Sequence, residues 1–423
     1  MRRAILVSIG TDGDVYPFLA IGIELRRRGY PVTLASHEHF ERRTREAGLE
    51  FQPLVSNEET KQLWQQRDFW HPIKGPLVAA RWGSRLLRSQ YEVLKSLASQ
   101  DEAVLVANPG VVAARMVQEK IKTPLISVLL QPWSIPSIHA PAVMMGGLTL
   151  PRWAPRPVGK IYFRLCNRLG AWLMGTEFKR LRGSLGLRPM RNLFQWWLSP
   201  QLILGLFPDW FGPPQPDWPP QIQLVGFPKN SSSTERLSED LVSFCKQDER
   251  VYAFTFGTGM MHATSLFEHA VEACRVLGAR AVFLTPFRSQ LPAQLPSFVH
   301  ACDFAPFQNL FPLCAVIVHH GGIGTLASAL RAGTPQLIIP FAFDQMDNAV
   351  RVKRLGAGTW LKPSRQNPQE ISLALDLLLN SDTVAKARSL AKHLQDSDGI
   401  ECAVDRIELC TQDAMIQPGG AVV

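Results

Sequence analysis

The sequence predicts an α/β protein built as two doubly wound domains, each around a parallel sheet. Its 423 residues exceed what one compact core usually holds, so two domains of roughly 200 residues each are expected. Short apolar runs rich in β-branched residues alternate with stretches whose apolar residues recur at helical spacing. The alternation stops once, at a proline-rich stretch, and then restarts, which predicts one sheet on each side.

The first half supplies the expected N-terminal domain, residues 1–226. The run RAILVSIG predicts a buried strand, the turn TDGDVYP follows, and FLAIGIELRRRG predicts a helix that opens near Pro17 and stops at Gly29. YPVTLAS and HFERRTREAG repeat the strand and the helix. EAVLVANPG and TPLISVLLQPW add two further strands.

The second half supplies the expected C-terminal domain, residues 241–410. Residues 208–228 hold seven prolines, and the polar stretch KNSSSTERLSED follows, so a linker is expected over 227–240. Strands are then expected in RVYAFTFGT, ARAVFLTPF, LCAVIVHH and PQLIIPFA, with helices over 264–278, from about 323 and from about Gln345. Residues 411–423 are expected to form a tail.

Composition bounds the location of the protein. The seven cysteines are scattered without a CxxC pair, which indicates a reducing compartment and argues against a zinc ribbon. No run approaches about 18 apolar residues, so no membrane-spanning helix is expected. The protein is therefore expected to be cytoplasmic, at most peripheral on the inner face of a membrane. The sequence does not predict an oligomeric state.

The positive charge is concentrated in one segment. Between residues 151 and 195 ten basic residues face one acid, Glu177, a difference equal to the net charge of +9. Lys160, Arg164 and Arg168 recur beside apolar residues at helical spacing. Segment 152–191 is either an amphipathic helix resting on anionic lipid or a solvated helix packed on its own domain. Proline and glycine interruptions favour the second interpretation, and no nucleic-acid-binding module accompanies the charge.

The motif HHGGIGT, residues 319–325, is the strongest local signal of a binding site. It follows the strand AVIV and opens a helix, so its backbone N–H groups and the helix dipole can hold an anion such as phosphate. A tight turn without a ligand is the competing interpretation. Zinc is less favoured, because adjacent histidines on a strand point to opposite faces and no HxxxH or cysteine partner is near.

The following strand adds a second polar group at the same sheet edge. Asp344 and Gln345 come after PQLIIPFA, where ligands of open parallel sheets bind. A carboxylate and an amide together can accept from and donate to sugar hydroxyls. A phosphate site beside a hydroxyl-binding pair indicates a nucleotide sugar.

The run from Val318 to Gly358 resembles the donor signature of the family 1 nucleotide-sugar-dependent glycosyltransferases, which have the two-domain GT-B fold. The resemblance implies two Rossmann-like domains facing across a cleft, with the donor on the C-terminal one. It also implies roles for particular residues. The diphosphate would contact the side chain of His319 and the backbone of Gly321, Gly322, Gly324 and Thr325, while the transferred sugar would contact Asp344 and Gln345.

Two further loops carry the same resemblance. DFAPFQNLF resembles the base-binding loop, so Phe304 would stack on a pyrimidine and Ala305 would offer backbone groups to its edge. A buried aromatic at a strand end is the alternative for Phe304. TFGTGM resembles the loop that faces the phosphates, which implies contacts from Gly257 and Thr258. Where many relatives place a ribose-binding carboxylate, this chain has Ala327 and Ser328. A deoxyribose lacks the 2′-hydroxyl that such a carboxylate binds, so this difference favours a dTDP-sugar over a UDP-sugar.

The N-terminal run SIGTDGDVYPFLAIGIELRRRG resembles the bacterial branch of the family, in which an aspartate deprotonates the acceptor. The resemblance assigns this role to Asp14. At the strand end where other members hold a histidine-orienting acid, this chain has Asn108, which fits an aspartate acting alone. The alternatives are that Asp14 only caps the helix, or that Asp12 is the base.

The acceptor side is implied more loosely. The run 197–228 resembles the rhamnosyltransferases of rhamnolipid synthesis, which implies a fatty-acid-derived hydroxyl acceptor and a deoxyhexose donor. The loop 131–147 is expected to line the acceptor site through Trp133, His139 and Met144. The expected reaction is inverting transfer of a hexose or deoxyhexose, with the nucleotide sugar as co-substrate and neither cofactor nor metal. A sugar-nucleotide epimerase and a non-catalytic nucleotide-sugar-binding partner are the rival functions.

Overall fold

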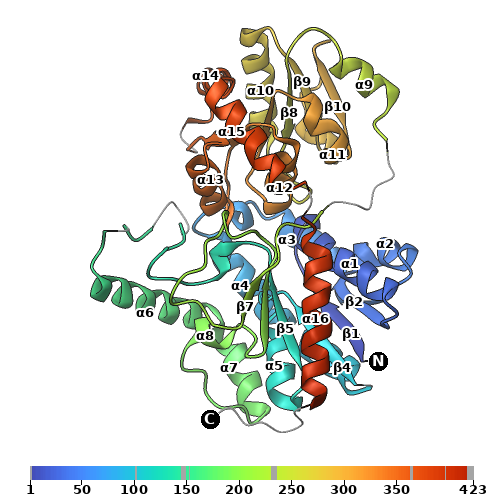
Figure 1. Ribbon diagram of the computed structural model, residues 1–423, viewed down its shortest axis with the longest axis vertical. Coiled ribbons are helices and arrows are strands. Elements are labelled where there is room, and N and C mark those ends of the chain that lie inside the picture. Colours follow the sequence, from blue (N-terminus) through green and yellow to red (C-terminus); the bar gives the residue numbers. More distant parts are fainter. Residues whose placement is uncertain are drawn as a thin grey trace.

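The computed structural model has two parallel-sheet domains stacked end to end (Figure 1). It describes residues 2–100, 102–143, 149–151, 153–229, 236–362, 365–395 and 397–416, with only the backbone over 413–416. The two doubly wound sheets confirm the predicted fold class. Among these residues no helix is both long enough and apolar enough to cross a membrane.

The N-terminal sheet has seven strands in the order β3-β2-β1-β4-β5-β6-β7, all paired in parallel. The strand order reverses between β1 and β4, which is the point where ligands of such sheets bind. The proline-rich stretch contributes β7 to this sheet. The strands are β1 (Arg3–Val7), β2 (Val32–His37), β3 (Glu50–Val55), β4 (Ala103–Ala107), β5 (Leu125–Leu129), β6 (Leu202–Gly205) and β7 (Ile222–Leu224).

Helices cover both faces of this sheet because alternate strand residues point to opposite sides. Leu6 enters one apolar core, and its neighbours Ile5 and Val7 enter the other. The helices are α1 (Asp12–Arg27), α2 (Glu41–Glu46), α3 (Asn57–Trp64), α4 (Gly75–Gln100), α5 (Val112–Ile121), α6 (Arg156–Leu173), α7 (Gly175–Ser184) and α8 (Leu193–Trp196), with short 3₁₀ helices η1 (Glu38–Phe40), η2 (Arg67–Trp70) and η3 (Pro132–Ser134).

The C-terminal sheet has six parallel strands in the order β10-β9-β8-β11-β12-β13. Its order reverses between β8 and β11, directly beside the glycine-rich motif. The strands are β8 (Val251–Thr255), β9 (Arg280–Leu284), β10 (Val299–Cys302), β11 (Val316–His319), β12 (Gln336–Ile338) and β13 (Gly358–Trp360). The helices are α9 (Glu239–Cys245), α10 (Thr264–Leu277), α11 (Phe307–Leu310), α12 (Ile323–Ala332), α13 (Gln345–Arg354), α14 (Pro368–Leu377) and α15 (Ser381–Lys392), with 3₁₀ helices η5 (Arg288–Gln290) and η6 (Phe311–Leu313).

The last helix, α16 (Gly399–Ile416), returns to the N-terminal domain, along which it runs in Figure 1. Its Ile400, Val404 and Ile407 enter the core that lies under α1. Arg28 bonds to Asp405 and to Glu408, each at 2.6 Å. The expected C-terminal domain, 241–410, therefore differs from the structure over residues 399–410, which lie on the N-terminal domain. Helix α16 continues to Ile416, and residues 417–423 of the expected tail lie outside the described residues.

Candidate functional site

The glycine-rich motif forms the turn between β11 and α12, as expected. Gly321 has φ 94°, a conformation that side chains disfavour, and a Cβ there would lie 2.9 Å from the Gln345 carbonyl oxygen. Gly322 is the N-cap of α12. Gly324 and Thr325 lie in the first turn of α12, where Gly324 is exposed and a Cβ on it would meet no atom within 4 Å. The start of α12 therefore presents backbone N–H groups to an accessible space.

His319 does not face that space. It is 0% exposed, its Nδ1 accepts from the backbone N–H of Gly321 at 3.1 Å, and its Nε2 lies 2.9 Å from Gln336 Oε1. Burial lowers the pKa of His319 to about 3, so the ring is neutral. The expected contact between His319 and the diphosphate is corrected, because both ring nitrogens are already used to hold the turn.

The second histidine of the motif is better placed, and sequence reasoning did not select it. His320 is partly exposed, and its ring lies between the two glycine turns of the site. A Cβ on Gly322 would come within 2.4 Å of His320 Nε2, and one on Gly257 within 3.1 Å of the same atom. Burial lowers the pKa of His320 to about 4, partly opposed by a hydrogen bond to the Thr255 backbone. His320 is therefore a neutral ring beside the start of α12.

The loop after β8 faces this turn and contacts the other domain. Gly257 has φ 93°. Thr258 forms a hydrogen bond with Asp12 of α1, and a Cβ on Gly259 would lie 3.1 Å from Trp70. The two domains thus meet at the loop that was expected to face the phosphates.

The base-binding loop follows β10. Phe304 is 59% exposed and Ala305 is buried. The alternative for Phe304, a buried aromatic at a strand end, is excluded by this exposure. A large aromatic ring open to solvent beside the sheet edge is suited to stacking on a base.

Asp14 lies in the first turn of α1, which begins at Asp12 instead of near Pro17. Its Oδ2 accepts from the backbone N–H of Thr11 at 2.8 Å and from Thr11 Oγ1 at 3.1 Å. Gly10 is required here, because a Cβ on it would lie 2.3 Å from Asp14 Oδ2. Asp14 thus does cap the helix. Among the described residues, nothing bonds its other oxygen, Oδ1.

Burial raises the pKa of Asp14, and the negative charge of Asp12 raises it further, while the hydrogen bonds from Thr11 act in the opposite direction. Asp14 remains partly accessible to solvent. The raised pKa makes Asp14 a stronger base than an ordinary carboxylate. Burial also raises the pKa of Asp12, but its bond to Thr258 occupies that side chain.

Asp344 lies opposite Asp14, at the start of α13. Burial, and then the charge of Asp14, raises the pKa of Asp344 to about 7. Asn348, one turn further along α13, donates from Nδ2 to Asp344 Oδ2 at 2.7 Å and to the Gly321 carbonyl at 2.9 Å. Asn348 is fully buried and links Asp344 to the glycine turn. Sequence analysis did not select Asn348, although its spacing of four residues from Asp344 places the two side chains next to each other on a helix.

The backbone before Asp344 is strained. Phe343 has φ 56°, an unusual conformation for a bulky residue, and its ring lies 5.3 Å from that of Phe69 in the N-terminal domain. Gln345 does not reach outward as expected. It is buried, and its Oε1 accepts from the backbone N–H groups of Phe341 and Ala342 at 2.7 and 3.0 Å, so it shapes the turn that carries Asp344.

The expected acceptor loop follows β5. Trp133 is half-buried in η3, and its Nε1 is buried without a hydrogen-bond partner among the described residues. His139 is exposed, and Met144 lies outside the described residues. Asp217 holds this loop by accepting from Ser137 Oγ and from the Ile138 N–H, each at 2.7 Å.

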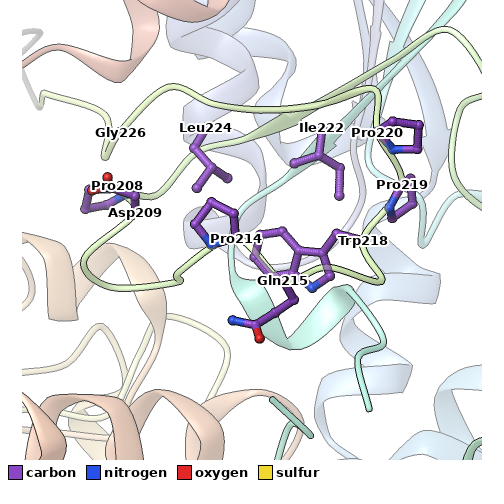
Figure 2. A pocket seen from close by; sticks show the side chains of 10 residues that line it. All are labelled: Pro208, Asp209, Pro214, Gln215, Trp218, Pro219, Pro220, Ile222, Leu224 and Gly226. Atoms are coloured by element: carbon purple, nitrogen blue, oxygen red, sulfur yellow. The ribbon is translucent and has the colours of Figure 1, made fainter. Parts of the chain in front are cut away.

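A separate groove lies along the proline-rich stretch, with a volume of about 610 Å³ (Figure 2). Prolines, Trp218 and Leu224 line it, with Asp209 at one end. None of the predicted site residues lines this groove.

Two family models match the chain. Residues 4–139 match the glycosyltransferase family 28 N-terminal domain, and residues 281–404 match the C-terminal domain of the erythromycin biosynthesis protein CIII-like family. The donor motif led us to expect family 1, whereas the N-terminal match carries the family number 28.

Curated relatives align along nearly the whole chain. A sterol 3-beta-glucosyltransferase of Arabidopsis thaliana is 27% identical over 95% of this chain, and the O-mycaminosyltylonolide 6-deoxyallosyltransferase of Streptomyces fradiae is 29% identical over 96% of it and 97% of the relative. The chain spans only 64% of that plant enzyme and 28% of a Leptosphaeria maculans sterol 3-beta-glucosyltransferase.

Solved structures support the fold. The calicheamicin glycosyltransferase CalG4 superposes with a TM-score of 0.69 at 20% identity, over 97% of this chain and 98% of that one. The spinosyn rhamnosyltransferase SpnG, complexed with thymidine diphosphate, gives 0.68 at 19% identity, over 96% and 100%. The solved structures show that the chain has the GT-B fold, and residues 4–139 are similar to a glycosyltransferase N-terminal domain.

Proposed function

We propose that this protein transfers a hexose or deoxyhexose from a dTDP- or UDP-linked donor to a hydroxyl of a lipophilic acceptor, with inversion at the anomeric carbon. One observation carries the proposal. Asp14 of the N-terminal domain is electrostatically coupled to Asp344 of the C-terminal domain, beside a glycine turn whose helix start is open to an anion.

Asp14 is the proposed general base. As the acceptor oxygen attacks the anomeric carbon, Asp14 Oδ1 takes the hydroxyl proton, while Oδ2 stays bonded to Thr11. The new glycosidic bond forms as the bond to the diphosphate oxygen breaks. A carboxylate whose pKa is raised by burial suits this role, because general-base efficiency rises as the pKa approaches the working pH.

The departing diphosphate is proposed to rest on the start of α12. Backbone N–H groups from Ile323 to Thr325 and the positive end of the helix dipole stabilise the negative charge that develops on it. His320 replaces His319 as the proposed side-chain donor, since its Nε2 lies between the two glycine turns. Thr258 would be released from Asp12 to face the phosphates.

Asp344 is proposed to hold hydroxyls of the transferred sugar. With a pKa near 7 it can accept a hydrogen bond as a carboxylate or donate one as an acid. Gln345 then acts indirectly, by fixing the turn in which Asp344 sits. Phe304 stacks on the base, and the backbone of Ala305 faces the base edge.

The nucleotide and the acceptor follow from weaker observations. Ala327 and Ser328, which offer no carboxylate to a ribose, favour dTDP over UDP. The relatives include a sterol 3-beta-glucosyltransferase and an O-mycaminosyltylonolide 6-deoxyallosyltransferase, which supports a lipophilic acceptor. The similarity of residues 197–228 to rhamnolipid rhamnosyltransferases adds a fatty-acid-derived hydroxyl as a candidate. Trp133 Nε1, His139 and Met144 remain the proposed acceptor contacts.

A thermal-shift panel of UDP-, dTDP- and GDP-sugars tests the donor, and mass spectrometry with sterol, hydroxy fatty acid and phenolic acceptors tests transfer. We expect stabilisation by dTDP- or UDP-sugars, and a glycosylated product that still forms in EDTA, because no metal takes part in the proposed reaction. Epimerised sugar nucleotide without acceptor would indicate the rival enzyme. Donor binding with no product from any acceptor would favour a non-catalytic partner.

A further inference from the structure

Helix α6 presents a stripe of large apolar side chains to solvent. Their positions are three or four residues apart, so they lie on one face of the helix. Of the whole helix only Gly159 is buried. A continuous apolar face on a water-exposed helix marks an interaction surface. We call this face the α6 stripe; it consists of Val158, Ile161, Leu165, Leu169 and Trp172, which are 46% to 65% exposed.

A row of basic residues borders the α6 stripe. Lys160, Arg164 and Arg168 are exposed and recur every four residues. At about 100° per residue they occupy the arc next to the stripe. Among the described residues no ion pair engages these three. By contrast, Arg182 of α7 bonds to Glu119 at 2.6 Å and serves the fold.

The opposite side of α6 is fixed to the domain. Asn167 Oδ1 accepts from the Leu193 N–H at 2.8 Å and from the Phe194 N–H at 3.3 Å. A Cβ on Gly159 would lie 3.5 Å from Ile138 Cβ, so α6 packs against the acceptor loop. These contacts orient the stripe outward, at the edge of the N-terminal domain where Figure 1 shows α6.

We propose that α6 docks this protein on an anionic lipid bilayer. The stripe enters the boundary between headgroups and acyl chains, and the basic row contacts lipid phosphates. Trp153, which is 83% exposed, and Trp172 lie at the two ends of the surface, where indole rings suit the headgroup region. The net charge of +9 adds long-range attraction to an anionic surface.

Charge argues against a second copy of the chain as the occupant. In an antiparallel two-fold pairing of α6 with itself, the two basic rows would lie on the same side of the contact. Like charges would then face each other without compensation. An anionic membrane satisfies the apolar stripe and the basic row at once.

Docking would also affect delivery of the acceptor. This one step rests on the proposed transfer reaction. Because α6 packs on Ile138, a docked helix holds the acceptor loop close to the bilayer. A lipophilic acceptor could then pass from the membrane to the site without entering bulk water. Docking itself needs no donor, acceptor or turnover.

The test is flotation of the full chain with vesicles of phosphatidylcholine alone or with about one third phosphatidylglycerol. We expect the wild type to float only with the anionic vesicles. Leu165→Gln/Leu169→Gln is expected to lower the partition coefficient at least about tenfold, because two apolar side chains would no longer enter the bilayer. Lys160→Gln/Arg164→Gln/Arg168→Gln is expected to lower it about a hundredfold, at about fivefold per charge.

Matched controls lie on the C-terminal domain. Leu373 and Leu377 of α14 are also four residues apart, and their exposures of 54% and 62% match the 58% and 51% of Leu165 and Leu169. Leu373→Gln/Leu377→Gln is expected to float like the wild type. Lys386→Gln/Arg388→Gln/Lys392→Gln on α15 removes the same three charges and is expected to change binding less than threefold, roughly the residual effect of net charge.

Three results would overturn the docking proposal. The α6 variants could float like the wild type, or the control variants could lose as much vesicle binding as the α6 variants do. Light scattering could also show a dimer that Leu165→Gln/Leu169→Gln dissociates, without any vesicle binding by the wild type. Equal thermal midpoints establish that each variant is folded. The flotation test contains no sugar donor, so its failure would leave the glycosyl-transfer proposal unaffected. Failure of the transfer assays would likewise leave the docking proposal unaffected.

Discussion

Burial, and then the negative charge of Asp14 in the first turn of α1, raises the pKa of Asp344 at the start of α13, so the two domains place opposed carboxyl groups in one site. Two carboxylates that share a poorly solvated space repel each other, and one of them is then protonated near neutral pH. Asp344 takes that role here, with a pKa of about 7.

The raised pKa of Asp344 makes the stability of the protein depend on pH. The folded protein binds the Asp344 proton more tightly than the unfolded chain, whose value is 3.8. The stabilisation is therefore complete below about pH 4 and is lost as pH rises toward 7. At pH values above 7, we expect Asp344→Asn to raise the free energy of unfolding by up to about 4 kcal/mol, and the thermal midpoint with it. Near pH 4 we expect little effect. Calorimetric melting across this range checks the sign, and equal effects at both ends would contradict it.

Asp14→Asn tests the general base. Asparagine keeps an oxygen that can accept from Thr11, so α1 stays capped while the proton acceptor is lost. We expect transfer to fall at least about a hundredfold, with donor affinity unchanged in calorimetry. Asp12→Asn is the matched control, since it removes a neighbouring carboxylate that is bonded to Thr258. If Asp12→Asn abolishes transfer and Asp14→Asn does not, the two roles must be exchanged.

The two histidines of the glycine-rich motif are expected to respond differently. His320→Ala should weaken dTDP binding by about tenfold or more, the scale of a hydrogen bond to a charged group, with a small change in stability. His319→Ala leaves the Gly321 N–H and Gln336 without a partner and should cost at least about 1–3 kcal/mol of stability. Titration calorimetry and thermal melting separate the two effects. Loss of dTDP affinity in His319→Ala without loss of stability would restore the original assignment.

The sequence was sufficient to predict the order of the elements that carry the candidate site. Strand–helix alternation predicts both sheets, and ligands of parallel sheets bind at strand ends, so the positions of Asp14, the glycine turn and Asp344 followed from the order of elements. The likeness of Phe304 to a base-stacking residue is compatible with its exposure. The element order could be predicted because it depends on local patterns and on connectivity, while the roles of these residues stay predictions.

The direction of individual side chains could not be predicted in the same way. His319 and His320 are adjacent, and which of them faces inward depends on where β11 ends, one residue before the turn. Gln345 turned back on its own loop because two backbone N–H groups there needed an acceptor. The sequence left two alternatives open for α6, a helix resting on lipid and a helix packed on its own domain, since an amphipathic pattern does not say which side the rest of the domain covers.

A buried ion pair on α13 makes hydrogen bonds to the N-terminal domain beside the acceptor loop. Asp347 Oδ2 bonds to Arg351 Nε at 2.6 Å, and its Oδ1 accepts from the Val143 N–H of the acceptor loop at 2.9 Å. Arg351 also donates to the Phe211 carbonyl at 3.0 Å. Helix α13 therefore holds two segments of the N-terminal domain, one through the carboxylate of Asp347 and one through the guanidinium of Arg351.

Breaking this contact should affect the acceptor more than the donor. Asp347→Ala removes the partner of Val143 and leaves Arg351 buried without its anion, so we expect a several-fold higher KM for the acceptor, a loss of about 3–5 kcal/mol of stability and unchanged dTDP affinity. Asp347→Asn keeps an oxygen for Val143 and should restore most of the acceptor KM, although the stability remains low. Steady-state kinetics with both variants, beside titration calorimetry with dTDP, separates the two effects. An equal rise in acceptor KM for both variants would show that the charge of Asp347, and not its bond to Val143, positions the acceptor loop.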